Sequence, residues 1–202
     1  MTKTLIAPED EIFPNRRRWT RAECAKMVEI GFLTGRYELI DGEVLSKMGQ
    51  HAPHASAMIL LGQWLTTLFG YLFVRSEKPL ILPGEEGDTT EPEPDFAVTR
   101  QSASAYFENN PGPQDASLVV EVADSSLNFD LTTKALLYTC VGIPEYWVMD
   151  VNGRRLHRHR QPTQDGYRDI MIFSETQSIS PLNRAESAPV SDFLPTPRNI
   201  SA

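Results

Sequence analysis

The sequence predicts a mixed α/β fold, because strand and helix patterns alternate along the chain. Residues 118–122 are an apolar run rich in valine, which is typical of a strand covered on both faces. A helical segment follows, and Gly142 and Pro144 mark its end. Residues 143–150 then have the composition of a second buried strand. This strand–helix–strand unit is the centre of the predicted fold.

Further elements precede this unit. Thr20 and Glu23 have the spacing of a capping box, which predicts the start of a helix. Asp41 and Gly42 lie between two short strand-like segments, and this pair favours the type I′ turn of a β-hairpin. The sequence therefore predicts, in order, a helix at about 20–30, a hairpin at 37–45, a helix at 53–69 and a strand from 93 to 98.

C-terminal β-hairpins are expected after the central unit. Asn152 and Gly153 predict a turn into residues 154–160, and short strands are expected at 167–173 and 178–182. The 154–160 segment holds four arginines and two histidines. Two interpretations remain open for it: a solvated edge strand, or a surface that contacts phosphates.

Glu121 is the most informative residue of the chain, because it interrupts the apolar strand at 118–122. A buried carboxylate costs several kcal/mol unless it is paired or bound to a metal. The strand period of two places Val119, Glu121 and Ala123 on one face. A helix that begins at Asn128 or Asp130 and packs over this face would bring Lys134 to Glu121.

Two alternatives compete for these charged residues. Asp95 enters the preceding strand and lies 26 positions before Glu121, so both carboxylates could bind one divalent cation from neighbouring strands. Lys134 would then add positive charge beside a phosphate, which suits phosphodiester hydrolysis. The competing interpretation is structural: Asp95 is a turn residue, Glu121 forms a structural ion pair and Lys134 is a solvated helix lysine.

Composition restricts the class of protein. The 202 residues are 41% hydrophobic and 9% aromatic, which favours one globular domain. No apolar run is long enough for a membrane span, and Cys24 and Cys140 lack zinc-site or disulfide-framework spacing, so a cytoplasmic protein with no membrane association is expected. A net charge of −8 argues against a passive nucleic-acid binder but permits carboxylates that hold a cation.

Several blocks of sequence resemble the Uma-type restriction endonuclease family, which is assigned to the PD-(D/E)xK nuclease superfamily. They are Tyr-Glu-Leu-Ile-Asp-Gly-Glu at 37–43, Pro-His at 53–54, Glu-Pro-Asp at 93–95, Val-Val-Glu-Val-Ala-Asp-Ser-Ser at 119–126, Lys134 with Tyr138, and Gly-Ile-Pro-Glu-Tyr-Trp-Val-Met-Asp at 142–150. The resemblance extends from about Trp19 to Leu194.

This resemblance implies a restriction-endonuclease-like core, with a central mixed β-sheet flanked by helices. It identifies Asp95 and Glu121 as the acidic pair and Glu38 as a further catalytic acid, and His54 also matches a recurrent family position. Ala123 stands where the short superfamily motif has its lysine, and the family pattern places that lysine at Lys134. The implied organisation is a flexible arm at 1–16, one domain at 17–195 and a tail at 196–202.

The leading hypothesis is an endonuclease that hydrolyses DNA with Mg²⁺, or Mn²⁺ as a substitute. Asp95 and Glu121 would hold the metal, while Lys134 would stabilise the transition state and help to deprotonate water, with Glu38 assisting. A homodimer would suit cleavage of both strands of a duplex. The alternatives are a non-catalytic module that binds nucleic acid or protein, and a hydrolase of other phosphate esters.

Overall fold

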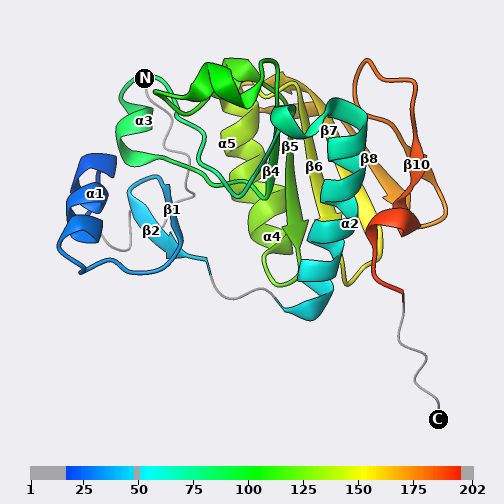
Figure 1. Cartoon of the computed structure of the whole chain (residues 1–202), viewed down its shortest axis with the longest axis horizontal. Helices are drawn as coiled ribbons and strands as arrows, with labels where there is room; N and C mark the ends of the chain where they lie inside the picture. Colours follow the sequence, from blue (N-terminus) through cyan, green and yellow to red (C-terminus); the bar gives the residue numbers. More distant parts are fainter. Residues whose placement is uncertain (1–16, 48–50, 197–202) are drawn as a thin grey trace, which may run out of the picture.

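The structure is a computed structural model that describes residues 17–47 and 51–196. Figure 1 shows a central sheet with helices on both sides. A smaller group of elements beside it holds α1 (Arg21–Glu29) and the hairpin of β1 (Tyr37–Ile40) and β2 (Glu43–Ser46). The predicted arm at 1–16 and all of the predicted tail except Thr196 lie outside the described residues.

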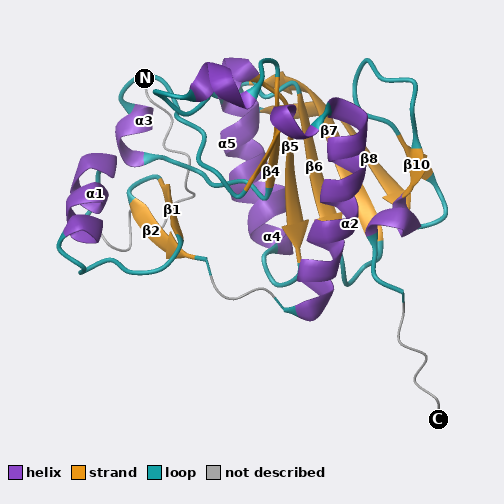
Figure 2. Ribbon diagram, in the orientation of Figure 1, coloured by secondary structure: helices purple, strands orange, loops and turns teal. Residues whose placement is uncertain are grey.

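The central sheet has six strands, which confirms the mixed sheet that the family resemblance implies (Figure 2). β5 and β6 are parallel, and every other pair of neighbours is antiparallel. In spatial order, the strands are β3 (Val74–Ser76), β4 (Phe96–Thr99), β5 (Ala116–Ala123), β6 (Glu145–Asp150), β7 (Arg155–Thr163) and β8 (Gly166–Ser174).

The two faces of β5 pack against different helices, as the strand period predicts. Val120 and Val122 lie in a cluster with buried residues of α2 (Ala52–Phe69), such as Leu61. Val119 and Ala123 lie in a second cluster, with Tyr138 of the helical crossover between β5 and β6. This crossover consists of α4 (Leu127–Phe129), the π-helical turn η5 (Asp130–Lys134) and α5 (Ala135–Cys140).

The predicted N-terminal helix and hairpin are present. Helix α1 (Arg21–Glu29) begins with a capping box in which Thr20 and Glu23 bond each other's backbone amides. In the hairpin β1 (Tyr37–Ile40) and β2 (Glu43–Ser46), Asp41 and Gly42 have φ values of 49° and 82°, as a type I′ turn requires. Ile40 and Leu45 pack against Leu137 of α5, so apolar contacts hold the hairpin to the crossover.

The remaining elements are short and connect or close the sheet. The C-terminal antiparallel pairs, β7 with β8 and β9 (Ser178–Ile179) with β10 (Ala188–Pro189), confirm the expected hairpins. The short elements are η2 (Tyr71–Phe73), α3 (Glu86–Thr89), η3 (Ala103–Tyr106), η4 (Pro113–Asp115), β9 (Ser178–Ile179), β10 (Ala188–Pro189) and η6 (Val190–Phe193). Within the described ranges, the helices are all too short or too polar to cross a membrane.

Two expectations about local structure are wrong. The crossover begins at Leu127, so neither Asn128 nor Asp130 caps it, and Asp130 lies inside the helix. The arginine-rich segment is not an edge strand, because β7 lies between β6 and β8. Its arginines pair with acids of the same protein: Arg154 with Glu175, Arg155 with Asp150, Arg158 with Asp169, and Arg160 with Glu145.

His159 of β7 should make the protein sensitive to acid. Its ring packs between Tyr146 and Tyr167, and burial lowers its pKa from 6.5 to about 4. The unfolded chain therefore takes up a proton before the folded chain does, so stability is complete above pH 6.5 and falls between pH 6.5 and 4. The loss attributable to this residue is about 3 kcal/mol.

We expect His159→Phe to keep the aromatic packing and to remove this titration. Urea unfolding at pH 7 and pH 4 measures the effect. The variant should lose less free energy of unfolding between these two pH values than the wild type does. Equal losses in the two proteins would show that His159 does not limit acid stability.

Candidate active site

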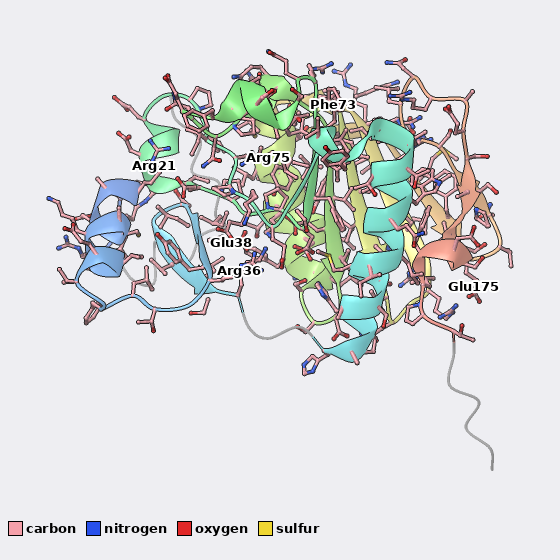
Figure 3. The ribbon with its side chains drawn as sticks, in the orientation of Figure 1. Arg21, Arg36, Glu38, Phe73, Arg75 and Glu175 are labelled. Carbon is pink, nitrogen blue, oxygen red and sulfur yellow. The ribbon has the colours of Figure 1, made fainter. Side chains whose placement is uncertain are left out.

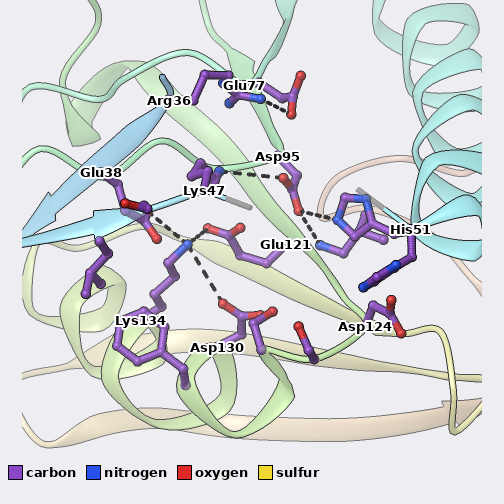
Figure 4. A pocket seen from close by; sticks show the side chains of 17 residues that line it. Arg36, Glu38, Lys47, His51, Glu77, Asp95, Glu121, Asp124, Asp130 and Lys134 are labelled. Atoms are coloured by element: carbon purple, nitrogen blue, oxygen red, sulfur yellow. Dashed lines mark hydrogen bonds and ion pairs between the residues drawn. The ribbon is translucent and has the colours of Figure 1, made fainter. Parts of the chain in front are cut away.

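Asp95 and Glu121 occupy neighbouring positions on one face of the sheet. The β4–β5 register pairs Phe96 with Val120, so the next position along places Asp95 opposite Glu121. Asp95 is 5% exposed and Glu121 is 2% exposed. The backbone amide of Val122 donates a hydrogen bond of 2.8 Å to Asp95 Oδ2. The two carboxylates therefore face the same space at the start of β4 (Figure 4).

Lys134 reaches Glu121 from the π-helical turn that covers this face. Its Nζ lies 3.0 Å from Glu121 Oε1, and the Tyr138 hydroxyl donates to the same oxygen at 3.0 Å. Lys134 is 3% exposed, so the interpretation of a solvated helix lysine is wrong. The helix does return over the sheet and bring the ammonium to Glu121.

Glu38, on the hairpin, forms a second ion pair with Lys134. Its Oε2 lies 3.0 Å from Lys134 Nζ, and its side chain is 7% exposed. Figure 3 shows Glu38 on the hairpin and Arg36 near it, on the side of the hairpin that faces the main body of the protein; Glu38 belongs to β1 and Arg36 directly precedes this strand. Glu38 is therefore buried, and its carboxylate points into the protein at Lys134.

Sequence reasoning missed three residues that the structure adds to this group. Asp130 Oδ1 lies 3.8 Å from Lys134 Nζ, and Ser126 Oγ donates to Asp130 Oδ2 at 2.6 Å. Lys47 Nζ lies 3.7 Å from Asp95 Oδ1. The spacing of Asp130, Lys134 and Tyr138, four residues apart each time, places all three on one helix face and could have indicated Asp130.

His54, which the family resemblance also indicates, stands on the other side of Asp95. Its Nε2 lies 3.6 Å from Asp95 Oδ2, and its side chain is 12% exposed. Its Nδ1 is buried without a hydrogen-bond partner among the described residues. The Asp95 carboxylate raises the pKa of His54 above 6.5, although burial opposes this shift.

The pKa values of the two central carboxyl groups are shifted in opposite directions, although burial acts on both in the same direction. Burial raises the pKa of Glu121 to about 8, and Asp95 and Asp130 reinforce this shift while Lys134 opposes it. Burial acts on Asp95 in the same way, but the contacts with His54, Lys47 and the Val122 amide outweigh it and lower the pKa. The pair therefore resembles two coupled acids with separated roles.

The helix side of the site depends on the charge of Lys134. Burial would lower its pKa, but Glu121, Glu38 and Asp130 outweigh burial and raise the pKa well above the usual lysine value. Burial raises the pKa of Asp130 to about 6. The ammonium is therefore a fixed positive charge that compensates a cluster of acids.

These residues line one pocket of about 420 Å³. Its lining includes Glu38, Lys47, His54, Asp95, Glu121 and Lys134. Carboxylate oxygens are the ligands that Mg²⁺ prefers, and the excess of acids over cations also fits a divalent ion. Within residues 17–47 and 51–196, no three histidine, cysteine or acidic side chains are grouped to hold a metal. The neighbouring carboxylates of Asp95 and Glu121 could hold an ion only if water molecules completed its coordination.

Comparison with known proteins supports the family resemblance. Residues 33–189 match the model of the Uma2 family, which is described as "Putative restriction endonuclease". The chain belongs to the Uma2 family. No curated protein matches it in sequence.

The Uma2 chain also shares its fold with a solved structure. That structure is described as a "putative nuclease belonging to DUF820 from Anabaena variabilis ATCC 29413". The two chains are 16% identical, the match covers 86% of this chain and 96% of that chain, and the TM-score is 0.63. At this identity, the similarity shows the fold alone.

Lys134→Met should destabilise this Uma2 protein strongly in the absence of a metal, because three carboxylates lose their shared cation. Breaking a buried ion pair in this way costs about 3–5 kcal/mol. Burial raises the pKa values of Glu121 and Asp130 above their unfolded values, so their contribution to stability falls as pH rises. At pH 5 both carboxyl groups are mostly protonated and need the ammonium little, whereas at pH 8 more of their negative charge depends on it. The loss of stability caused by Lys134→Met should therefore be larger at pH 8 than at pH 5.

Chemical unfolding at both pH values with EDTA present measures this difference. Lys26→Met is the matched control, because Lys26 is exposed on α1. It should change stability by less than about 0.5 kcal/mol. A Lys134 variant as stable as this control at pH 8 would show that the ammonium does not hold the acids together.

Proposed function

We propose that this protein is a metal-dependent endonuclease that hydrolyses phosphodiester bonds of DNA. The observation that carries the proposal is the convergence of Asp95, Glu121, Lys134 and Glu38 on one pocket. Membership of the Uma2 family and the fold of the Anabaena variabilis protein support the same class of reaction.

Asp95 and Glu121 would hold Mg²⁺, and Mn²⁺ takes similar oxygen ligands. A bound divalent cation supplies positive charge to a phosphate and lowers the pKa of water to make a nucleophile. Among the described residues, the hydrogen bonds of Glu121 both end on Oε1. The described part of the chain therefore leaves its other oxygen for this purpose.

Lys134 would stabilise the negative charge that develops on the phosphate in the transition state. Its raised pKa favours this role over deprotonation of water, because the residue keeps its proton at neutral pH. Glu38 and Asp130 hold the ammonium from two sides and so fix its position. Tyr138 fixes Glu121 Oε1 in the same way.

Cleavage of both strands of a duplex needs two such sites. We include a homodimer in the proposal, since a two-fold axis relates two sites to the two antiparallel strands. Sedimentation with and without a duplex oligonucleotide would measure the oligomeric state.

The proposal predicts cleavage of supercoiled plasmid DNA that requires Mg²⁺ or Mn²⁺ and is abolished by EDTA. Asp95→Asn, Glu121→Gln and Lys134→Ala should each lower the rate at least about 100-fold, because the first two remove a charged metal ligand and the third removes the positive charge beside the phosphate. Glu29→Gln is the control: it makes the same change as Glu121→Gln at an exposed position on α1 and should keep wild-type activity.

Calorimetry with Mn²⁺ separates the competing functions. Binding that is lost in Asp95→Asn supports the enzyme. Equal cleavage by the wild type and all three site variants would remove these residues from the mechanism. Nucleic-acid binding that is indifferent to metal, without turnover, would instead support a non-catalytic binding module.

A further inference from the structure

We propose that Lys47 is an exchangeable cation of this site: it neutralises Asp95 when no metal is bound, and binds a phosphate of the nucleic acid when a divalent cation takes its place. This inference rests on the proposed function and assigns a new residue to it. Lys47 follows β2, so the hairpin that brings Glu38 to Lys134 also brings Lys47 to Asp95.

The two oxygens of Asp95 have different partners. Oδ2 accepts the hydrogen bond from the Val122 amide and faces His54 Nε2 at 3.6 Å. Oδ1 faces Lys47 Nζ at 3.7 Å. In the described part of the chain, Oδ1 is therefore the oxygen that a cation can reach by displacing only Lys47. Figure 4 shows Lys47 and Asp95 on the same wall of the pocket.

The contact between Lys47 and Asp95 is loose. At 3.7 Å it is an ion pair without a hydrogen bond, and the ammonium donates instead to the backbone carbonyl of Glu93. The Lys47 side chain is 17% exposed, whereas that of Lys134 is 4% exposed and is held by three carboxylates. Lys134 is thus held by three carboxylates, while Lys47 has one carboxylate, which it contacts without a hydrogen bond, and one backbone carbonyl.

A metal and Lys47 compete for the same carboxylate. Two positive ions on one oxygen repel each other, so a bound divalent cation and the ammonium of Lys47 exclude each other at Oδ1 of Asp95. The Lys47 amide bonds Arg36 O at 2.9 Å, so the backbone stays in place while the side chain moves. Arg36, the neighbouring cation of the wall, is already paired with Glu77 and Glu93. Lys47 is therefore better suited than Arg36 to receive a phosphate.

Lys47→Met should have opposite effects on the two ligands. Calorimetry with Mn²⁺ alone should give about tenfold tighter binding, since the competing charge is gone. Anisotropy of a labelled oligonucleotide, measured with Ca²⁺ and with product formation monitored, should give about five- to tenfold weaker binding. The slope of log K against log salt should also fall in magnitude by about 0.9 for a duplex, or 0.7 for a single strand, as one lost phosphate contact requires.

Lys26→Met removes the same charge at an exposed position of α1 and should leave both affinities near the wild-type values. If Lys47→Met weakens the binding of both ligands, or leaves the Mn²⁺ affinity unchanged, the exchange is refuted. An unchanged salt slope would refute the phosphate contact. If the wild type binds neither Mn²⁺ nor the oligonucleotide, the proposed function itself fails, and this result is distinct from failure of the Lys47 exchange.

Discussion

The site depends on one buried ammonium. Lys134 Nζ lies 3.0 Å from a carboxylate oxygen of Glu38 and 3.0 Å from one of Glu121, so a single charge joins the hairpin, the sheet and the crossover helix. Burial of any one of these groups alone would be costly, and the shared ammonium offsets part of that cost for each carboxylate. The π-helical turn matters here, since it holds Asp130 and Lys134 on the side that faces β5. Such turns recur at functional sites in helices.

The cluster is not fully compensated. Around Glu121, burial and two neighbouring acids outweigh Lys134, and they raise the pKa of its carboxyl to about 8. A protein that needed only a stable core would place an apolar residue here, as it does at Val119 and Ala123. The retained acid therefore carries a cost in stability that binding of a divalent cation would offset. This balance is the physical link between the fold and the proposed chemistry.

The sequence predicted those parts of the site that leave a local pattern. Glu121 is visible because it breaks a run of valines, and its face follows from the strand period. The hairpin follows from Asp41 and Gly42. Lys47 could not be found in this way, because it follows a short strand and its contact with Asp95 depends on how the hairpin packs. The position of the arginine-rich segment inside the sheet was missed for the same reason, because strand order depends on tertiary packing. β8 pairs with the side of β7 that would otherwise be the edge of the sheet.

The hairpin shows how apolar packing sets the geometry of a polar site. Its register pairs Glu38 with Leu45, and Ile40 and Leu45 pack against Leu137. A shift of one residue in this register would turn the opposite face of a strand to the protein. Glu38 would then point away from Lys134, although no charged residue had changed. The Asp-Gly turn and the packing of Ile40 and Leu45 against Leu137 thus determine where the two charges of the hairpin arrive. Glu38 meets the ammonium of Lys134, and Lys47 meets the carboxylate of Asp95.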